Sequence, residues 1–197
     1  MNLQDRIDNY VKVTKYPRSL FISEDGRIVG TWFMGQDYTV SSGYYGGFPH
    51  GYTKRIMALF PDIFNDATPR EKILHLFSGK IDTQEFPGMT VDINPELKPD
   101  YVDDAQRLEK VPLENFIFAD GDPPYSVEDA EHYKATMVKR NLVFKALGSR
   151  LPVGAFVVWL DQVEPMYRKD QFKIVAAIGM VKSTNHRFRM VLIFERV

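Results

Sequence analysis

The stretch Phe116-Ile117-Phe118-Ala119-Asp120-Gly121-Asp122-Pro123-Pro124-Tyr125 decides how the rest of the chain is interpreted. Its first four residues form an apolar run that predicts a buried strand. The two prolines fix two φ angles and remove two N–H donors, so the loop presents carbonyl acceptors beside the Asp122 carboxylate, and the Tyr125 ring can stack on a flat group. An acid followed by two prolines is also an ordinary way to end a strand and begin a turn. The neighbouring elements must decide between these interpretations.

Apolar runs at other positions predict six further strands, at residues 73–77, 89–93, 101–103, 155–160, 172–180 and 188–194. Apolar side chains recur at helical spacing from residue 127 to 147, and Gly148 stands where a helix end is expected. The last two strands are joined by residues 182–187, which is too short for a parallel crossover, so they should form an antiparallel hairpin. The sequence therefore predicts an open, mostly parallel α/β sheet with a terminal antiparallel hairpin and a ligand at the switch point.

The first 70 residues are predicted to form a small β-rich N-terminal extension, and residues 71–197 the main domain. Residues 19–23 and 27–33 flank Asp25-Gly26, which is typical of a β-hairpin turn. Residues 42–52 are too rich in glycine and aromatic side chains for a regular element and fit an aromatic-packed surface loop. A helix is expected from residue 52 to 60.

Composition excludes several classes of protein. The chain has 197 residues, 44% of them hydrophobic, which is enough for one sizeable core. It has no cysteine, and its four histidines are widely separated, so we expect neither a disulfide nor a metal site. The N-terminus lacks the apolar run of a signal peptide, and no stretch approaches the roughly 18 apolar residues that span a bilayer. We expect a soluble, cytoplasmic protein without a membrane partner.

Charge is unevenly distributed, although the net charge is only −1. Residues 82–131 carry fourteen acids and three bases, whereas residues 134–197 carry four acids and twelve bases. One explanation is complementary pairing within the fold or between subunits. The other is a functional basic surface that binds DNA or RNA, built from Arg168, Lys169, Lys182, Arg187 and Arg189. The sequence leaves both open.

Taken in order, these features resemble the class I S-adenosylmethionine-dependent methyltransferases, and among them the DPPY-type amino-methyltransferases that modify adenine N6 or cytosine N4. The resemblance covers residues 73–197. It rests on Leu74-His75-Leu76-Phe77-Ser78-Gly79, on an acid ending the next strand, on Asp104-Ala105 after the third, on the Asp122 to Tyr125 loop and on the terminal hairpin. Singly, each feature has an ordinary explanation as a turn or a solvated acid. Their order favours a cofactor site.

The resemblance implies S-adenosylmethionine as cofactor and a role for each matching residue. The turn Phe77-Ser78-Gly79 would approach the methionine part, Asp92 with Ile93 the ribose hydroxyls, and Asp104 with Ala105 the adenine amine. An N-terminal segment, here Tyr44, Tyr45 and Gly46, would fold over the cofactor. The catalytic loop would be Asp122, Pro123, Pro124 and Tyr125, with Asp122 next to both the cofactor and the amine, and Arg168, Lys169, Arg187 and Arg189 would bind the substrate.

The implied activity is methyl transfer to an exocyclic amine, most simply that of a nucleobase in DNA or RNA. A small-molecule or protein amine, or an inactive cofactor-binding regulatory subunit, are the alternatives. Relatives that methylate specific DNA sequences devote many residues to target recognition that this chain lacks, which leaves room for a homo-oligomer or a specificity partner.

Three departures from the family pattern stand out. The first turn has a single glycine, and the residues from Gly79 to Thr90 leave room for only a stunted first helix, interrupted by Pro87-Gly88. Asp120-Gly121 precedes the loop, so either Asp120 or Asp122 could face the substrate. We prefer Asp122 because the motif begins there.

Overall fold

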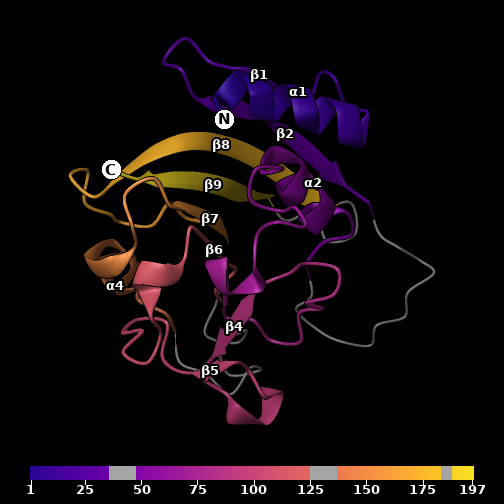
Figure 1. Cartoon of the computed structure of the whole chain (residues 1–197). Helices are drawn as coiled ribbons and strands as arrows, with labels where there is room; N and C mark the ends of the chain where they lie inside the picture. The colour runs from indigo at the N-terminus through magenta and orange to yellow at the C-terminus, as the bar shows by residue number, and fades with distance from the viewer. Residues whose placement is uncertain (36–47, 125–136, 183–187) are drawn as a thin grey trace.

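Nine strands pair into one sheet in the computed structural model, which describes residues 1–35, 48–124, 137–182 and 188–197 (Figure 1). The strand order is β1-β2-β8-β9-β7-β6-β3-β4-β5. The bounds are β1 Leu20–Ile22, β2 Ile28–Met34, β3 Ile73–Leu76, β4 Met89–Asp92, β5 Tyr101–Val102, β6 Phe118–Gly121, β7 Phe156–Asp161, β8 Phe172–Lys182 and β9 Phe188–Arg196.

The topology places a switch point between β3 and β6. From β3 the chain moves outward to β4 and β5, and it then returns to add β6 and β7 on the other side of β3, all in parallel. Strand β9 is antiparallel to both β7 and β8, so β8 runs in the same direction as β7. The carboxyl ends of β2, β3, β4, β5, β6, β7 and β8 therefore lie along one side of the sheet, which we call the carboxyl edge. The predicted parallel sheet with a terminal antiparallel hairpin is confirmed.

Helices cover the two faces of the sheet. Helices α1 (Leu3–Thr14) and α2 (Tyr52–Leu59) pack on each other and on one face, and α4 (Arg140–Arg150) covers part of the other. Within the described residues, 3-10 turns lie at Arg70–Lys72, Pro95–Leu97 and Leu113–Asn115. No helix in the described ranges is long and apolar enough to cross a bilayer.

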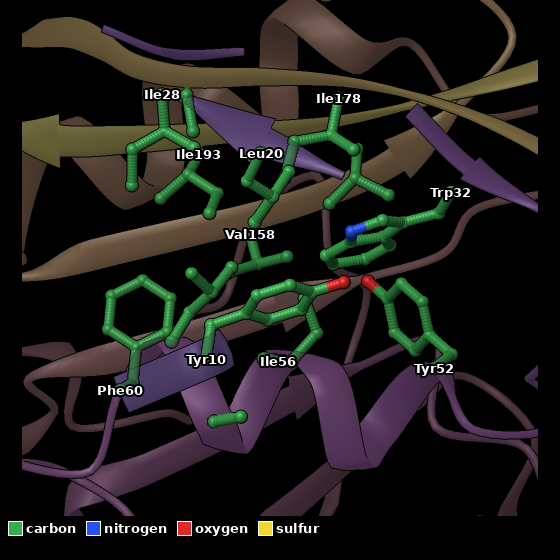
Figure 2. Packing of buried hydrophobic residues seen from close by; sticks show 14 of the residues in the cluster. Tyr10, Leu20, Ile28, Trp32, Tyr52, Ile56, Phe60, Val158, Ile178 and Ile193 are labelled. Carbon is green, nitrogen blue, oxygen red and sulfur yellow. The ribbon is translucent and has the colours of Figure 1, made fainter. Parts of the chain in front are cut away.

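The core on the α1 and α2 face is rich in aromatic side chains (Figure 2). Trp32 of β2 is fully buried; its ring stacks on Tyr10 of α1 at a centroid distance of 6.1 Å and meets Tyr52 of α2 edge-on at 6.3 Å. Both helices therefore pack against the strand that extends the sheet beyond β8. Side chains alternate along β3, so Leu74 and Leu76 lie on the α4 face of the sheet and His75 lies on the α1 and α2 face.

The N-terminal hairpin is confirmed, with Gly26 at φ 79° in its turn. The second strand of this hairpin, β2, also joins the main sheet, because it pairs in parallel with β8 from Ile28 to Met34. Helix α1 was not predicted. A reciprocal pair of hydrogen bonds between Asn2 and Asp5 caps its start, and only three of its side chains are buried.

Several helix and strand boundaries differ from the prediction. Helix α4 begins at Arg140, residues 137–139 are not helical, and residues 125–136 lie outside the described ranges. Gly148 lies inside α4, where an added Cβ would stand 2.5 Å from the Gln171 amide oxygen. Gly148 therefore allows close packing against Gln171 and does not end the helix. Strand β6 begins two residues later than predicted, and residues 77–88 form turns with no helix at all.

Candidate functional site

The turn after β3 has an unusual backbone at the switch point. Phe77 has φ 55° and Gly79 φ 53°, both left-handed, and the Ser78 N–H donates to the Val91 carbonyl at 3.1 Å. A left-handed phenylalanine is strained and needs support from its surroundings. That support comes from Trp159 of β7, whose ring meets the Phe77 ring edge-on at 6.0 Å. The turn is therefore held between β4 and β7.

Asp92 joins the end of β4 to this turn. One carboxylate oxygen accepts the Gly79 N–H at 3.0 Å, and the other accepts the Asn94 N–H at 2.9 Å. The side chain is half-buried. Because an ionised carboxylate offers about four lone-pair sites, each oxygen keeps capacity for one further donor. Asp92 can therefore hold the turn and still accept hydrogen bonds from two hydroxyl groups.

Asp103 and Asp104, in the loop after β5, have different hydrogen-bond partners. The Asp103 carboxylate is engaged by the N–H groups of Asp104 at 2.8 Å and Lys110 at 2.7 Å. In Asp104, Oδ1 accepts the Gln106 N–H at 2.9 Å, whereas Oδ2 has only a 3.4 Å contact with the Gln106 amide. Asp104 therefore has an oxygen available for a ligand amine. Beside these acids, Ala105 is buried and Ile93 is 49% exposed.

The loop after β6 brings Asp122, Pro123 and Pro124 to the same edge. Asp122 is half-buried and both prolines are buried. Tyr125 lies outside the described residues, as do Tyr44, Tyr45 and Gly46.

Asp120 lies in the interior and not at the edge. Its side chain is 1% exposed, with Oδ2 3.8 Å from His75 Nδ1 and Oδ1 3.5 Å from the Tyr52 hydroxyl. His75 Nε2 lies 3.2 Å from the Pro87 carbonyl, so this nitrogen must be the donor. Burial raises the pKa of Asp120, and the nearby His75 and Tyr52 side chains oppose that rise only in part. Of the two acids that the sequence left open, Asp122 is the one at the carboxyl edge.

A further acid at this edge was missed by sequence reasoning. Asp161 ends β7, is 1% exposed, and accepts hydrogen bonds from Arg140 Nε at 2.5 Å, Arg140 NH2 at 3.0 Å and Trp159 Nε1 at 3.0 Å. The ion pair between Arg140 and Asp161 fixes the start of α4 against the end of β7. No local pattern connects residues 140 and 161, so the sequence held no signal for the contact.

Of the four basic residues predicted to bind substrate, the three that the structure describes are not brought together. Arg168 and Lys169 precede β8 and so lie at the opposite side of the sheet from the carboxyl edge, where Arg168 pairs with Asp170 at 2.5 Å. Arg189 is opposite Met180 near the carboxyl end of β8, and Arg187 lies outside the described residues. Within the described ranges, Arg150–Glu114 at 3.9 Å is the ion pair that links the acidic and basic segments. Extensive pairing between the two segments is therefore not observed there.

No group of three or more His, Asp or Glu side chains in the described part of the chain is placed to hold a metal ion. A hollow of about 370 Å³ lies between α1 and β1, lined by Ile7, Val11, Leu20 and Phe21 among others. None of the predicted site residues borders it, so it is separate from the switch point.

Comparison with known proteins agrees with the fold. No family model and no curated protein matches the sequence. TrmN from Thermus thermophilus superimposes with a TM-score of 0.54 at 14% identity, over 77% of this chain and 50% of that one. The chain shares a Rossmann-like α/β fold with TrmN. It spans half the length of TrmN. Two weaker likenesses each have a TM-score of 0.42. An rRNA methylase from Streptococcus thermophilus is 10% identical over 66% of this chain and 89% of that one. SMU.1697c from Streptococcus mutans, in complex with SAH, is 11% identical over 66% of this chain and 90% of that one.

Proposed function

We propose that the chain is an S-adenosylmethionine-dependent methyltransferase that modifies an exocyclic amine, and that this amine belongs to a nucleobase in DNA or RNA. The observation that carries the proposal is the arrangement of Asp92. Its carboxylate ties the turn after β3 to the end of β4 at the switch point and keeps two acceptor sites for hydroxyl groups. In open α/β sheets, ligands bind at this position.

The residues at the carboxyl edge fit the proposed cofactor. Asp92 suits the two ribose hydroxyls, the backbone of Phe77-Ser78-Gly79 suits close approach by the methionine part, and Asp104 Oδ2 suits the adenine amine. S-adenosylmethionine supplies a methyl group on a cationic sulfur, which keeps the bonding electron pair when an amine attacks the methyl carbon. Several acids around a cationic ligand are electrostatically favourable.

The loop after β6 would act on the amine. An exocyclic amine on a heteroaromatic ring is a weak nucleophile because its lone pair is delocalised into the ring. The Asp122 carboxylate and the Pro123 carbonyl can accept its two hydrogens, which favours a pyramidal nitrogen and orients it for attack. Asp122 then takes the proton that the methylated nitrogen must lose. The stacking role of Tyr125 remains part of the proposal.

Two experiments test this function. Incubation with S-adenosylmethionine labelled in its methyl group, together with pools of DNA, RNA, protein and metabolites, should place the label on nucleic acid. Label on a protein or a small amine would identify one of the alternatives, and cofactor binding without any transfer would indicate a regulatory subunit.

Calorimetry with S-adenosylhomocysteine tests the cofactor site directly. Asp92→Ala should weaken binding by about 1.5–3 kcal/mol, the range for hydrogen bonds to a charged group. Asp82→Ala, an exposed acid in the connection from β3 to β4, is the matched control and should bind as the unaltered protein does. Unchanged affinity in a folded Asp92→Ala protein would remove Asp92 from the site.

A further inference from the structure

The Gln106 side chain joins the loop after β5 to the start of α4. Its amide oxygen accepts the N–H of Lys139, the residue before α4, at 3.0 Å. Its amide nitrogen lies 3.2 Å from Asp104 Oδ1 and 3.4 Å from Asp104 Oδ2. Because an N–H only donates and a carboxylate oxygen only accepts, both ends of the amide meet partners of the complementary kind. These partners fix the orientation of the amide.

Helix α4 also holds this loop from its other end. The Arg150 guanidinium donates to the Val111 carbonyl at 3.0 Å and to the Leu108 carbonyl. Leu108 is fully buried and has a left-handed φ of 52°, a conformation that persists only where the surrounding structure holds it. The helix itself is tied to the end of β7 by the ion pair between Arg140 and Asp161. The loop is therefore attached at two places to a helix that is anchored on the sheet.

These contacts determine how the Asp104 carboxylate is presented. Oδ1 accepts the backbone N–H of Gln106 at 2.9 Å as well as the side-chain amide, so two donors of one residue engage it. The Asp104 carbonyl accepts the N–H groups of Arg107 at 2.8 Å and Leu108 at 2.9 Å, which closes the backbone of the turn. A side chain that is already ordered in this way loses little freedom when Oδ2 accepts a ligand N–H.

We propose that Gln106 is a positioning residue that makes the cofactor site select an adenine carrying its 6-amino group. Gln106 holds Oδ1 of Asp104, which leaves Oδ2 to accept an N–H of that amine. A purine without the amine would leave Oδ2 without this donor. Because the same amide also accepts the Lys139 N–H, the selectivity depends on the position of the start of α4. This inference rests on the proposed function and deepens it by assigning a residue to adenine recognition.

The test compares two ligands by calorimetry, S-adenosylhomocysteine and its analogue with hydrogen in place of the 6-amino group. The unaltered protein should bind S-adenosylhomocysteine about 10- to 100-fold more tightly than the analogue, the range for one hydrogen bond to a charged group. In Gln106→Ala this ratio should fall about two- to tenfold, through weaker binding of S-adenosylhomocysteine. A purely structural role would weaken both ligands equally and leave the ratio unchanged, which would overturn the proposal.

A second variant and a matched control complete the test. Gln106→Glu keeps the length of the side chain and an acceptor for the Lys139 N–H, but it places a second carboxylate against Asp104. It should lose selectivity as Gln106→Ala does, and it decides the question if Gln106→Ala does not fold; undiminished selectivity would overturn the proposal. The control is Gln84→Ala. The Gln84 N–H donates to Asp82 Oδ1 at 2.8 Å in the same kind of turn, but its side chain is exposed, so selectivity should not change.

Failure of this inference is distinct from failure of the proposed function. If neither ligand binds the unaltered protein, the proposed function is wrong. If S-adenosylhomocysteine binds but the analogue binds equally well, Asp104 does not recognise the amine, and the inference fails while the role of Asp92 stands. If the unaltered protein is selective and Gln106→Ala is equally selective, Asp104 does not need Gln106 and the inference is again wrong.

Discussion

At the scale of single residues, two acids only two positions apart have opposite environments. Asp120 still belongs to β6, and its side chain lies beneath α2 beside His75 and Tyr52. Asp122 follows the end of the strand and is half-buried at the carboxyl edge. Their chemical roles should differ accordingly, because burial raises the pKa of the Asp120 carboxyl, whereas a carboxylate at the edge can accept a proton from a ligand.

Asp122→Ala should abolish methyl transfer and leave S-adenosylhomocysteine affinity nearly unchanged. Asp122→Asn keeps an acceptor for the amine but cannot take up its proton, so we expect it to lose about 10²- to 10⁴-fold in kcat with little change in KM. Single-turnover rates and calorimetry on the same preparations measure both quantities. Full activity in Asp122→Ala would show that the loop does not serve the amine.

Asp120 makes stability depend on pH. Its pKa is raised in the folded protein, so the folded state holds its proton at pH values where the unfolded chain has released it. The free energy of unfolding should therefore fall as pH rises above about 4, until the folded-state pKa is passed. Asp120→Asn should remove that fall and be the more stable protein at pH 8.

The control for this titration is Asp25→Asn. Asp25 is exposed, and its pKa is lowered by the Ser23 hydroxyl, so its contribution to pH dependence has the opposite sign. Urea unfolding from pH 4 to pH 8 compares the three proteins. Parallel curves for the unaltered protein and Asp120→Asn would show that Asp120 is ionised in both states.

Sequence reasoning placed Asp92, Asp104 and Asp122 correctly at the ends of strands, because strand ends are marked locally by the change from apolar to polar residues. It could not place Asp120, because its partner His75 is 45 positions away and comes into register only when β3 and β6 pair. For the same reason, the sequence could not show that the basic residues are divided between two sides of the sheet. Arg168 and Arg189 are assigned to opposite sides of the sheet by the direction of β8, which no local pattern shows.

At the scale of elements, the contact between β6 and β7 holds the candidate site together. Gly121 faces Trp159 across the two strands, and a Cβ at residue 121 would stand 2.8 Å from the indole ring. The same indole supports Phe77 and donates to Asp161. One glycine thus lets a single tryptophan contact both the turn after β3 and the anchor of α4.

Gly121→Ala should destabilise the protein by about 1–3 kcal/mol, the cost of overpacking a filled interior. Gly35→Ala is the control, since a Cβ there meets nothing within 4 Å and the backbone is not left-handed. In a double-mutant cycle, adding Trp159→Phe should cost less in the Gly121→Ala background than alone, because the smaller ring relieves the clash. Strict additivity of the two losses in urea unfolding would contradict this account.

The strands were predictable as elements because each is a short apolar run, whereas the helices were less so. Helix α1 buries only Arg6, Ile7 and Tyr10, so its apolar pattern is weak. Gly148 looked like a helix end because glycine often marks one, but here tertiary packing against Gln171 explains the residue. The connection from β3 to β4 was expected to hold a stunted helix, but it contains only turns.

At the scale of the whole molecule, Arg6 ties the N-terminal helix to the centre of the sheet. The guanidinium donates to Asp62 at 2.7 and 2.9 Å and to the Leu59 carbonyl at 2.9 Å, and it lies over the rings of Phe60 and Phe156. Its side chain is 3% exposed, and that of Asp62 is 36% exposed. The first helix, the end of α2 and the start of β7 therefore meet at one residue.

Arg6→Ala should lower the free energy of unfolding by about 2 kcal/mol or more, because it removes charged hydrogen bonds and buried packing together. Arg27→Ala, which breaks the exposed pair with Asp25, should change it by less than about 1 kcal/mol. Urea unfolding followed by tryptophan fluorescence and by circular dichroism should give coincident transitions. A separate early transition in Arg6→Ala would show that residues 1–70 unfold as an independent domain.

The parallel pairing of β2 with β8 has a consequence for how the chain reaches its native state. Residues 28 and 176 are neighbours in the sheet, yet the whole intervening chain must be synthesised before they can meet. Until then, β2 presents a bare hydrogen-bonding edge with Trp32 and Phe33 beside it, the kind of surface that templates aggregation or recruits chaperones. Contacts between such distant residues also slow the search for the native topology. Refolding from denaturant should accordingly be slow and lose yield as protein concentration rises.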